Sequence, residues 1–107
     1  VYGEGQVLAA AGLGAAYAAP YLGRLDDAGR DGRAILVRMQ QLALAAADLR
    51  LLAASLRAPQ RVIDLAAAGL DTFTFGPDVA CGLIDEPLTR AAADDFQRAA
   101  SAMGDAR

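Results

Sequence analysis

A hydroxyl side chain and a guanidinium side chain stand two residues apart near the middle of the chain, at Ser55 and Arg57. They follow an apolar segment and precede Pro59, which suits the first position of a helix. A helix start presents unpaired N–H groups, and arginine donates paired hydrogen bonds to phosphate. We interpret this pair as a candidate phosphate site. The alternative is a turn serine beside a solvated arginine.

Two further side chains follow an earlier apolar segment: Tyr21 at its end and Arg24 three residues later. The carboxyl ends of parallel strands meet at one edge of a sheet, so Arg24 would close the pocket of Ser55 and Arg57 from the other side. The Tyr21 phenol can donate a proton or orient a water. The alternative is a rim aromatic with its hydroxyl in solvent.

The residue types that are absent narrow the chemistry. The 107 residues include no histidine, and all ten basic side chains are arginine, so no side chain here can form a Schiff base. The single cysteine, Cys81, excludes an internal disulfide and a multi-cysteine zinc site, and we expect it to pack among apolar neighbours. We expect neither a metal nor a cofactor.

Charge and hydropathy argue against two classes of partner. The net charge is -3 and no basic run is present, so a nucleic-acid partner is not expected. The uncharged stretch 5–23 is mostly alanine and glycine and contains Pro20, which disfavours a membrane span. No basic segment precedes it, so a signal peptide is not expected either.

The apolar segments alternate with helical patterns, which predicts an α/β architecture with parallel strands. Val1 and Tyr2 are expected to end a strand, and 22–32, rich in glycine and aspartate, to form a loop whose acids pair with its own arginines. The helix over 33–47 should bury Ile35, Met39, Leu42 and Ala46. The expected strands are 15–21, 49–55 and 71–75, and the expected helices are 5–11, 33–47, 59–68, 77–83 and 87–103.

Three blocks of the sequence together resemble the small transaldolases and fructose-6-phosphate aldolases. They occur in the order and at nearly the spacing of that family, and they cover almost the whole chain. The blocks are VYGEGQVLAAAGLGAAYAAPYLGRLDDAGRDG (1–32), LLAASLRAPQRVIDLAAAGLDTFTF (51–75) and DVACGLIDEPLTRAAADDFQRA (78–99).

The resemblance implies a class I aldolase-type (β/α)8 (TIM) barrel. In such enzymes a lysine on the fourth strand forms a Schiff base with a ketose phosphate. Residues 1–107 would be a single partial domain, the C-terminal half of the barrel from the end of strand 5 through helix 8, since a whole barrel needs about 250 residues. The lysine would lie outside this chain, so we expect the chain alone to be inactive.

The resemblance also implies roles for the candidate site residues. Arg24, Ser55 and Arg57 match the positions that hold the substrate phosphate. Tyr21 matches a tyrosine that assists acid–base steps through a water in the aldolases, whereas transaldolases usually have phenylalanine there. Gly23 and the LDDAG loop look more like the transaldolases, so the subtype stays open.

Partners and location follow from the same resemblance. We expect a sugar-phosphate substrate, an N-terminal half-barrel segment, a cytoplasmic location, and a homo-oligomer built through the last helix, where Leu88, Phe96 and Met103 are apolar. The alternative function is a non-catalytic half-barrel that binds a sugar phosphate or acts as a scaffold, since a half-barrel exposes sheet edges that favour pairing.

Overall fold

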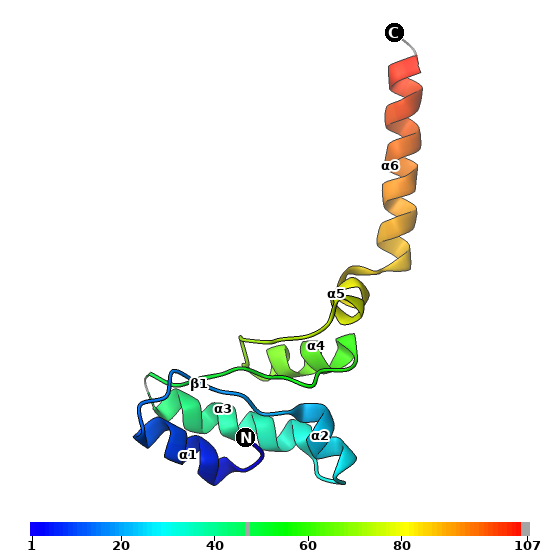
Figure 1. Cartoon of the computed structure of the whole chain (residues 1–107). Coiled ribbons are helices and arrows are strands. Elements are labelled where there is room, and N and C mark those ends of the chain that lie inside the picture. Colours follow the sequence, from blue (N-terminus) through cyan, green and yellow to red (C-terminus); the bar gives the residue numbers. More distant parts are fainter. Residues whose placement is uncertain (47, 106–107) are drawn as a thin grey trace.

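The computed structural model describes residues 1–46 and 48–105, and within them helices alternate with short parallel strands (Figure 1). The order agrees with the predicted α/β alternation as far as α4, whereas the predicted strand 71–75 forms only an isolated bridge at Phe73. The elements are α1 (Glu4–Gly12), β1 (Tyr17–Ala18), α2 (Leu22–Asp27), α3 (Gly32–Ala45), β2 (Arg50–Leu51), α4 (Pro59–Ala67), α5 (Pro77–Ile84) and α6 (Pro87–Asp105).

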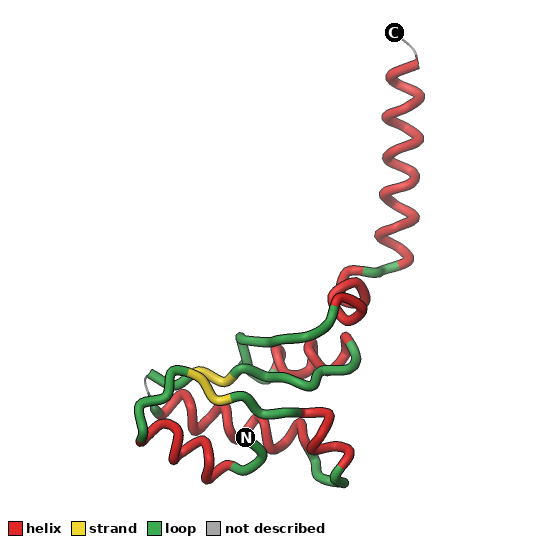
Figure 2. Tube along the Cα trace, in the orientation of Figure 1, coloured by secondary structure: helices red, strands yellow, loops and turns green. Residues whose placement is uncertain are grey.

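Three extended segments run parallel to one another, although only short pieces of them are regular strands (Figure 2). β1 pairs with β2 in the register Tyr17 to Arg50 and Ala18 to Leu51. Isolated parallel bridges join Tyr21 to Ala54 and Ala53 to Phe73. The predicted strands 15–21, 49–55 and 71–75 therefore lie side by side in the predicted direction, but most of their length is irregular.

Pro20 explains why the first strand is short. The Ala18 carbonyl accepts from Leu52 N at 2.9 Å, and the Pro20 carbonyl accepts from Ala54 N at 2.9 Å. Alternate residues of a parallel strand also donate to the neighbour, and proline has no N–H to donate. The ladder is interrupted at Pro20 and resumes where Leu22 N donates to the Ala54 carbonyl at 3.0 Å.

One face of the parallel segments is covered by helices, and the other face is open. Ala18 and Leu51 are buried, whereas their strand neighbours Tyr17 and Arg50 are exposed. α3 packs against α1, α2, α4 and β2. The core on this side is formed mainly by aliphatic side chains, with Val7, Leu22, Leu25, Leu36, Met39, Leu51 and Leu65 almost completely buried.

The predicted loop over 22–32 is wrong in its first half, which forms the helix α2. Leu22 and Leu25 lie one turn apart and are both 1 % exposed, so their burial stabilises the turn. The glycine-rich end of the segment is a turn, with Gly29 at a φ of 77°. Asp31 then caps α3 by accepting a hydrogen bond from Ala34 N at 3.1 Å.

Three smaller predictions also need correction. Met39 is buried and Ile35, Leu42 and Ala46 are partly buried against the core, as predicted, but the buried face of α3 is centred on Leu36, Met39 and Ala43. Cys81 is exposed and not packed. No strand includes Val1 or Tyr2 in the described part of the chain, although the Val1 amino group donates to the Ala19 carbonyl at 2.8 Å. The predicted end of α3 at Ala47 lies outside the described residues.

The C-terminal helix α6 projects away from the rest of the molecule (Figure 1). Its apolar side chains Leu88, Phe96 and Met103 are 79 %, 77 % and 74 % exposed. The molecule is correspondingly elongated, with principal extents of 67 × 31 × 19 Å. Across residues 1–46 and 48–105, no helix combines the length and the apolar content that a membrane span requires.

Candidate functional site

Ser55 lies in the turn that connects β2 to α4 and has an unusual backbone conformation. Its φ is 56°, and it is the one non-glycine residue with a positive φ in the described part of the chain. Such a conformation is unfavourable for a residue with a Cβ and needs support from its surroundings. The support comes from α2, because Gly23 N donates to the Ser55 carbonyl at 2.9 Å.

Arg57, two residues further on, reaches back across α2 to Asp27. Its Nη1 and Nη2 donate to Asp27 Oδ1 and Oδ2, each at 2.9 Å, in a paired arrangement. These hydrogen bonds lower the pKa of the Asp27 carboxyl below its ordinary value and raise the pKa of Arg57. Both side chains are more than half exposed, so solvent screens the pair.

Gly23 makes room for this arginine. A Cβ at position 23 would lie 2.7 Å from Arg57 Nε, 2.8 Å from Arg57 Cζ and 2.8 Å from the Ser55 carbonyl oxygen. Any larger residue would therefore displace either the guanidinium or the Ser55 turn. The close approach of α2 to the Ser55–Arg57 segment depends on glycine at this position.

Ser55 and Arg57 line one cavity of about 220 Å³, and Arg24, which was expected to close it, is not part of its lining. The cavity also includes Ala58, which is the N-cap of α4, and Arg61 in the first turn of that helix. Arg61 forms an ion pair with Asp26. The complete lining is Leu22, Gly23, Asp26, Ser55, Arg57, Ala58 and Arg61.

Arg24 lies in a separate cavity of about 370 Å³, with Tyr2, Leu25, Ala28 and Arg30. Its Nη1 donates to the Tyr2 hydroxyl at 3.2 Å, and this hydrogen bond raises the pKa of Arg24. The charge of nearby Arg57 acts in the opposite direction on that pKa. The structure therefore brings Ser55 and Arg57 together and holds Arg24 close by, in a neighbouring cavity.

Tyr21 lies beneath Arg24. The guanidinium carbon of Arg24 is 5.0 Å from the centroid of the Tyr21 ring, a cation–π contact. The ring also packs against Tyr2, with centroids 5.8 Å apart and planes tilted by 48°. Tyr2 and Tyr21 thus fix the guanidinium from two sides. The sequence singled out Tyr21 and overlooked Tyr2.

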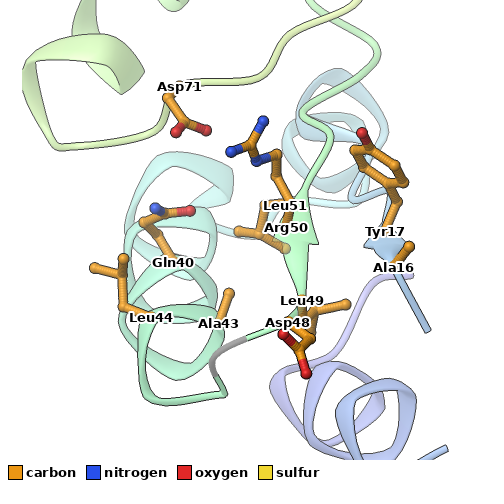
Figure 3. A pocket seen from close by; sticks show the side chains of 10 residues that line it. All are labelled: Ala16, Tyr17, Gln40, Ala43, Leu44, Asp48, Leu49, Arg50, Leu51 and Asp71. Atoms are coloured by element: carbon orange, nitrogen blue, oxygen red, sulfur yellow. The ribbon is translucent and has the colours of Figure 1, made fainter. Parts of the chain in front are cut away.

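A larger cavity of about 460 Å³ lies at the opposite, amino ends of the parallel segments (Figure 3). It includes Tyr17, Arg50 and Asp71, together with Gln40 and Asp48. Reactive groups in parallel α/β folds collect at the carboxyl ends of the strands. We therefore place the candidate site at the Ser55 end and not in this larger cavity.

The acids of the 22–32 segment pair with distant arginines, which corrects the expectation of pairing within the loop. Asp26 pairs with Arg61 and Asp27 with Arg57, and these partners are 35 and 30 residues apart in sequence. The sequence missed both acids and Arg61 as neighbours of the site. In residues 1–46 and 48–105, no cluster of acidic, cysteine or histidine side chains suits a metal ion.

Parallel segments separated by helices, with a cavity lined by two guanidinium groups at their carboxyl ends, define an α/β architecture. Residues 1–106 match the family model described as transaldolase/fructose-6-phosphate aldolase, and the chain belongs to that family. Membership implies a (β/α)8-barrel fold. The resemblance inferred from the three sequence blocks is confirmed.

Individual relatives agree with this membership. A protein of Nitrosopumilus maritimus named "Probable transaldolase" is 35 % identical over 98 residues, which are 90 % of this chain and 44 % of that protein. Proteins with the same name from Desulfitobacterium hafniense and Methanococcus maripaludis are 37 % and 38 % identical over 90 % and 83 % of this chain. In those two the matched part is 46 % and 42 % of the relative. The chain thus spans less than half the length of these curated relatives.

Proposed function

We propose that this chain is the C-terminal part of a transaldolase or fructose-6-phosphate aldolase-like class I enzyme that acts on ketose phosphates. Residues 1–107 would run from the end of strand 5 through helix 8 of the barrel. The family match over residues 1–106 supports the proposal, and so does the alignment with a protein named as a probable transaldolase, of which it covers 44 %. The parallel segments with helices on one face suit a part of a barrel.

In this proposal Ser55, Arg57 and Arg24 hold the phosphate group of the substrate. The observation that carries the assignment is the cavity shared by Ser55, Arg57 and the N-cap of α4. A hydroxyl, a guanidinium and a helix start are all groups that stabilise a phosphate dianion. Arg24 would add a further positive charge from the adjacent cavity.

Tyr21 would serve the acid–base steps through a water molecule, next to the phosphate site. It ends the extended segment that carries β1 and contacts Arg24, so a phenol and a phosphate-binding guanidinium stand together. The chain contains no lysine, so the lysine that forms the Schiff base would come from outside residues 1–107.

The phosphate assignment is tested by titration calorimetry of the full native polypeptide with fructose 6-phosphate. Arg57→Ala should weaken binding by about tenfold, because it removes the charge-assisted hydrogen bonds to the phosphate group. Arg98→Ala on α6 removes an equal charge far along the chain and should leave binding unchanged. Equal affinities for the two variants would refute the assignment of Arg57.

The catalytic assignment is tested by borohydride trapping with fructose 6-phosphate. The completed barrel should become covalently labelled, and residues 1–107 should carry no label because they lack a lysine. A label on these residues would contradict the proposal. A second candidate, a non-catalytic sugar-phosphate-binding or scaffold half-barrel, is favoured by the same lack of lysine. It would be preferred if neither the native polypeptide nor a partner chain supplies a lysine at a strand end.

The exposed apolar side chains of α6 support a further part of the proposal, a homo-oligomer formed through this helix. Leu88, Phe96 and Met103 recur at helical spacing, along with Ala92 and Ala99, on a helix that is exposed along its described length. Removal of residues 88–107 should lower the number of subunits per assembly, which light scattering measures. An unchanged number of subunits would exclude α6 as the contact.

A further inference from the structure

The guanidinium of Arg57 is already occupied by an internal anion. Asp27 accepts from both terminal nitrogens at 2.9 Å, which is the paired geometry that a phosphate group also prefers. The third side of the guanidinium lies against Gly23, where even a Cβ would be 2.7 Å from Nε. The edge of Arg57 that is best suited to phosphate is therefore the edge that Asp27 holds.

The neighbouring pair of Asp26 and Arg61 behaves differently. Asp26 is 33 % exposed and also accepts a hydrogen bond from Gly32 N at 3.2 Å, so two partners hold it in place. Asp27 is 61 % exposed and is bonded to Arg57 alone in the part of the chain that the structure describes. Asp26 and Asp27 each pair with an arginine that lines the cavity, and Asp27 is the one that is free to move away.

We propose that Asp27 is an internal competitor for the phosphate site, which neutralises Arg57 when the site is empty and is displaced when the phosphate group arrives. The proposal rests on the proposed function, since it assumes that Arg57 binds phosphate. The contact serves to lower the affinity of the empty site for every anion. It also supplies a partner for Arg57 as the product leaves.

The competition makes a quantitative prediction. Any anion that binds the two terminal nitrogens of Arg57 must break the same contact with Asp27. Removing the Asp27 carboxylate should therefore raise the affinity for all such anions by the same factor. Exposed ion pairs are weak because solvent screens them, so the factor should be small, about two- to fivefold. A carboxylate whose role is to position Arg57 would give the opposite sign, because its removal would weaken binding.

The experiment measures the affinity of the full native polypeptide for glycerol phosphate and for inorganic sulfate by titration calorimetry. The test variant is Asp27→Asn, which keeps the shape and removes the charge. The matched control is Asp31→Asn, which removes a charge from the same segment and keeps the cap of α3, because asparagine caps as well as aspartate. Asp27→Glu keeps the charge and should bind like the unmodified protein.

We expect Asp27→Asn to bind both anions about two- to fivefold more tightly, while Asp31→Asn stays close to the unmodified protein. Equal gains in anion affinity in the two variants would mean that the loss of one negative charge alone explains the effect, and the inference would be overturned. Weaker binding by Asp27→Asn would also overturn it. Arg57→Ala distinguishes failure of this inference from failure of the proposed phosphate site. If Arg57→Ala abolishes anion binding while Asp27→Asn has no effect, only the competition by Asp27 is refuted. If Arg57→Ala leaves anion binding intact, the proposed phosphate site is refuted as well.

Discussion

The segment from α1 to α4 and the helix α6 differ in how their apolar side chains are used. In the first region Leu36 and Leu65 are fully buried, and helices cover one face of the parallel segments. In α6, Phe96 is 77 % exposed, and the side chains of residues 87–104 are all exposed. Both regions are rich in alanine, so composition alone does not separate them.

The difference indicates where the stability of this chain resides. Helices are stabilised in proteins mainly by packing of an apolar face, and α6 has such a face without a packed neighbour among residues 1–46 and 48–105. The candidate site belongs entirely to the packed region, because Tyr21, Arg24, Ser55 and Arg57 all precede α4. Substitutions in the packed region should therefore affect folding and the site together, and substitutions in α6 should affect neither.

The comparison is tested most directly by shortening one apolar side chain to alanine in each region. Leu65→Ala removes a fully buried side chain from α4 and should lower the free energy of unfolding by about 2–5 kcal/mol. Phe96→Ala should change it by less than about 0.5 kcal/mol, since the ring is mostly exposed. Urea denaturation followed by circular dichroism checks both values. Similar losses for the two variants would mean that α6 packs onto the body in solution.

Glycine substitutions extend the comparison to the site. Gly23→Ala should destabilise the protein by about 1–3 kcal/mol, because its Cβ would overlap Arg57 and the Ser55 carbonyl. In Gly5→Ala, in α1, the added Cβ has no neighbouring atom within 4 Å, so the substitution should stabilise the protein by about 0.5–1 kcal/mol. Thermal unfolding of the two variants provides the measurement. A neutral Gly23→Ala would show that Arg57 does not lie against α2.

The sequence was sufficient for features that depend on local chemistry. Pro59 and Pro77 occupy the first turns of α4 and α5, as predicted. The N–H groups of a first turn have no partner within the helix, so proline, which has no N–H, is favoured there. The parallel direction of the extended segments also follows from the alternation of strands and helices. Ser55 and Arg57 line one cavity because they are close neighbours in the chain, while their role in binding phosphate stays a prediction.

Features that depend on distant partners escaped sequence reasoning. α2 was predicted as loop because its glycine and aspartates favour turns, whereas burial of Leu22 and Leu25 against α3 decides its structure. The pairing of Asp27 with Arg57 spans 30 residues, and no periodicity in the sequence connects the two. The placement of Arg24 beside Tyr2 is likewise a contact between residues 22 positions apart.

A smaller effect is expected at the cap of α3, which supports the packed region from its edge. Asp31→Ala removes the acceptor for Ala34 N and should lower the free energy of unfolding by about 0.5–2 kcal/mol. Asp94→Ala removes a carboxylate from the exposed helix α6 and should leave it within about 0.5 kcal/mol. Urea denaturation of the two variants compares them. Equal values would mean that the cap contributes nothing.

The smallest effect concerns the acid dependence of the Asp27–Arg57 pair. Because the hydrogen bond from Arg57 lowers the folded-state pKa of Asp27, the stabilising contribution of this pair is fully present above the unfolded-state pKa. It is lost as pH falls through the lowered folded-state pKa. The difference in stability between the unmodified protein and Asp27→Asn should therefore shrink toward zero in acid.

In Arg57→Ala the pKa of Asp27 should rise toward its ordinary value, which nuclear magnetic resonance titration of the carboxyl carbon can measure. An unchanged pKa in that variant would mean that the pair does not form in solution, and that α2 is held to the start of α4 by its other contacts, among them the ion pair of Asp26 with Arg61.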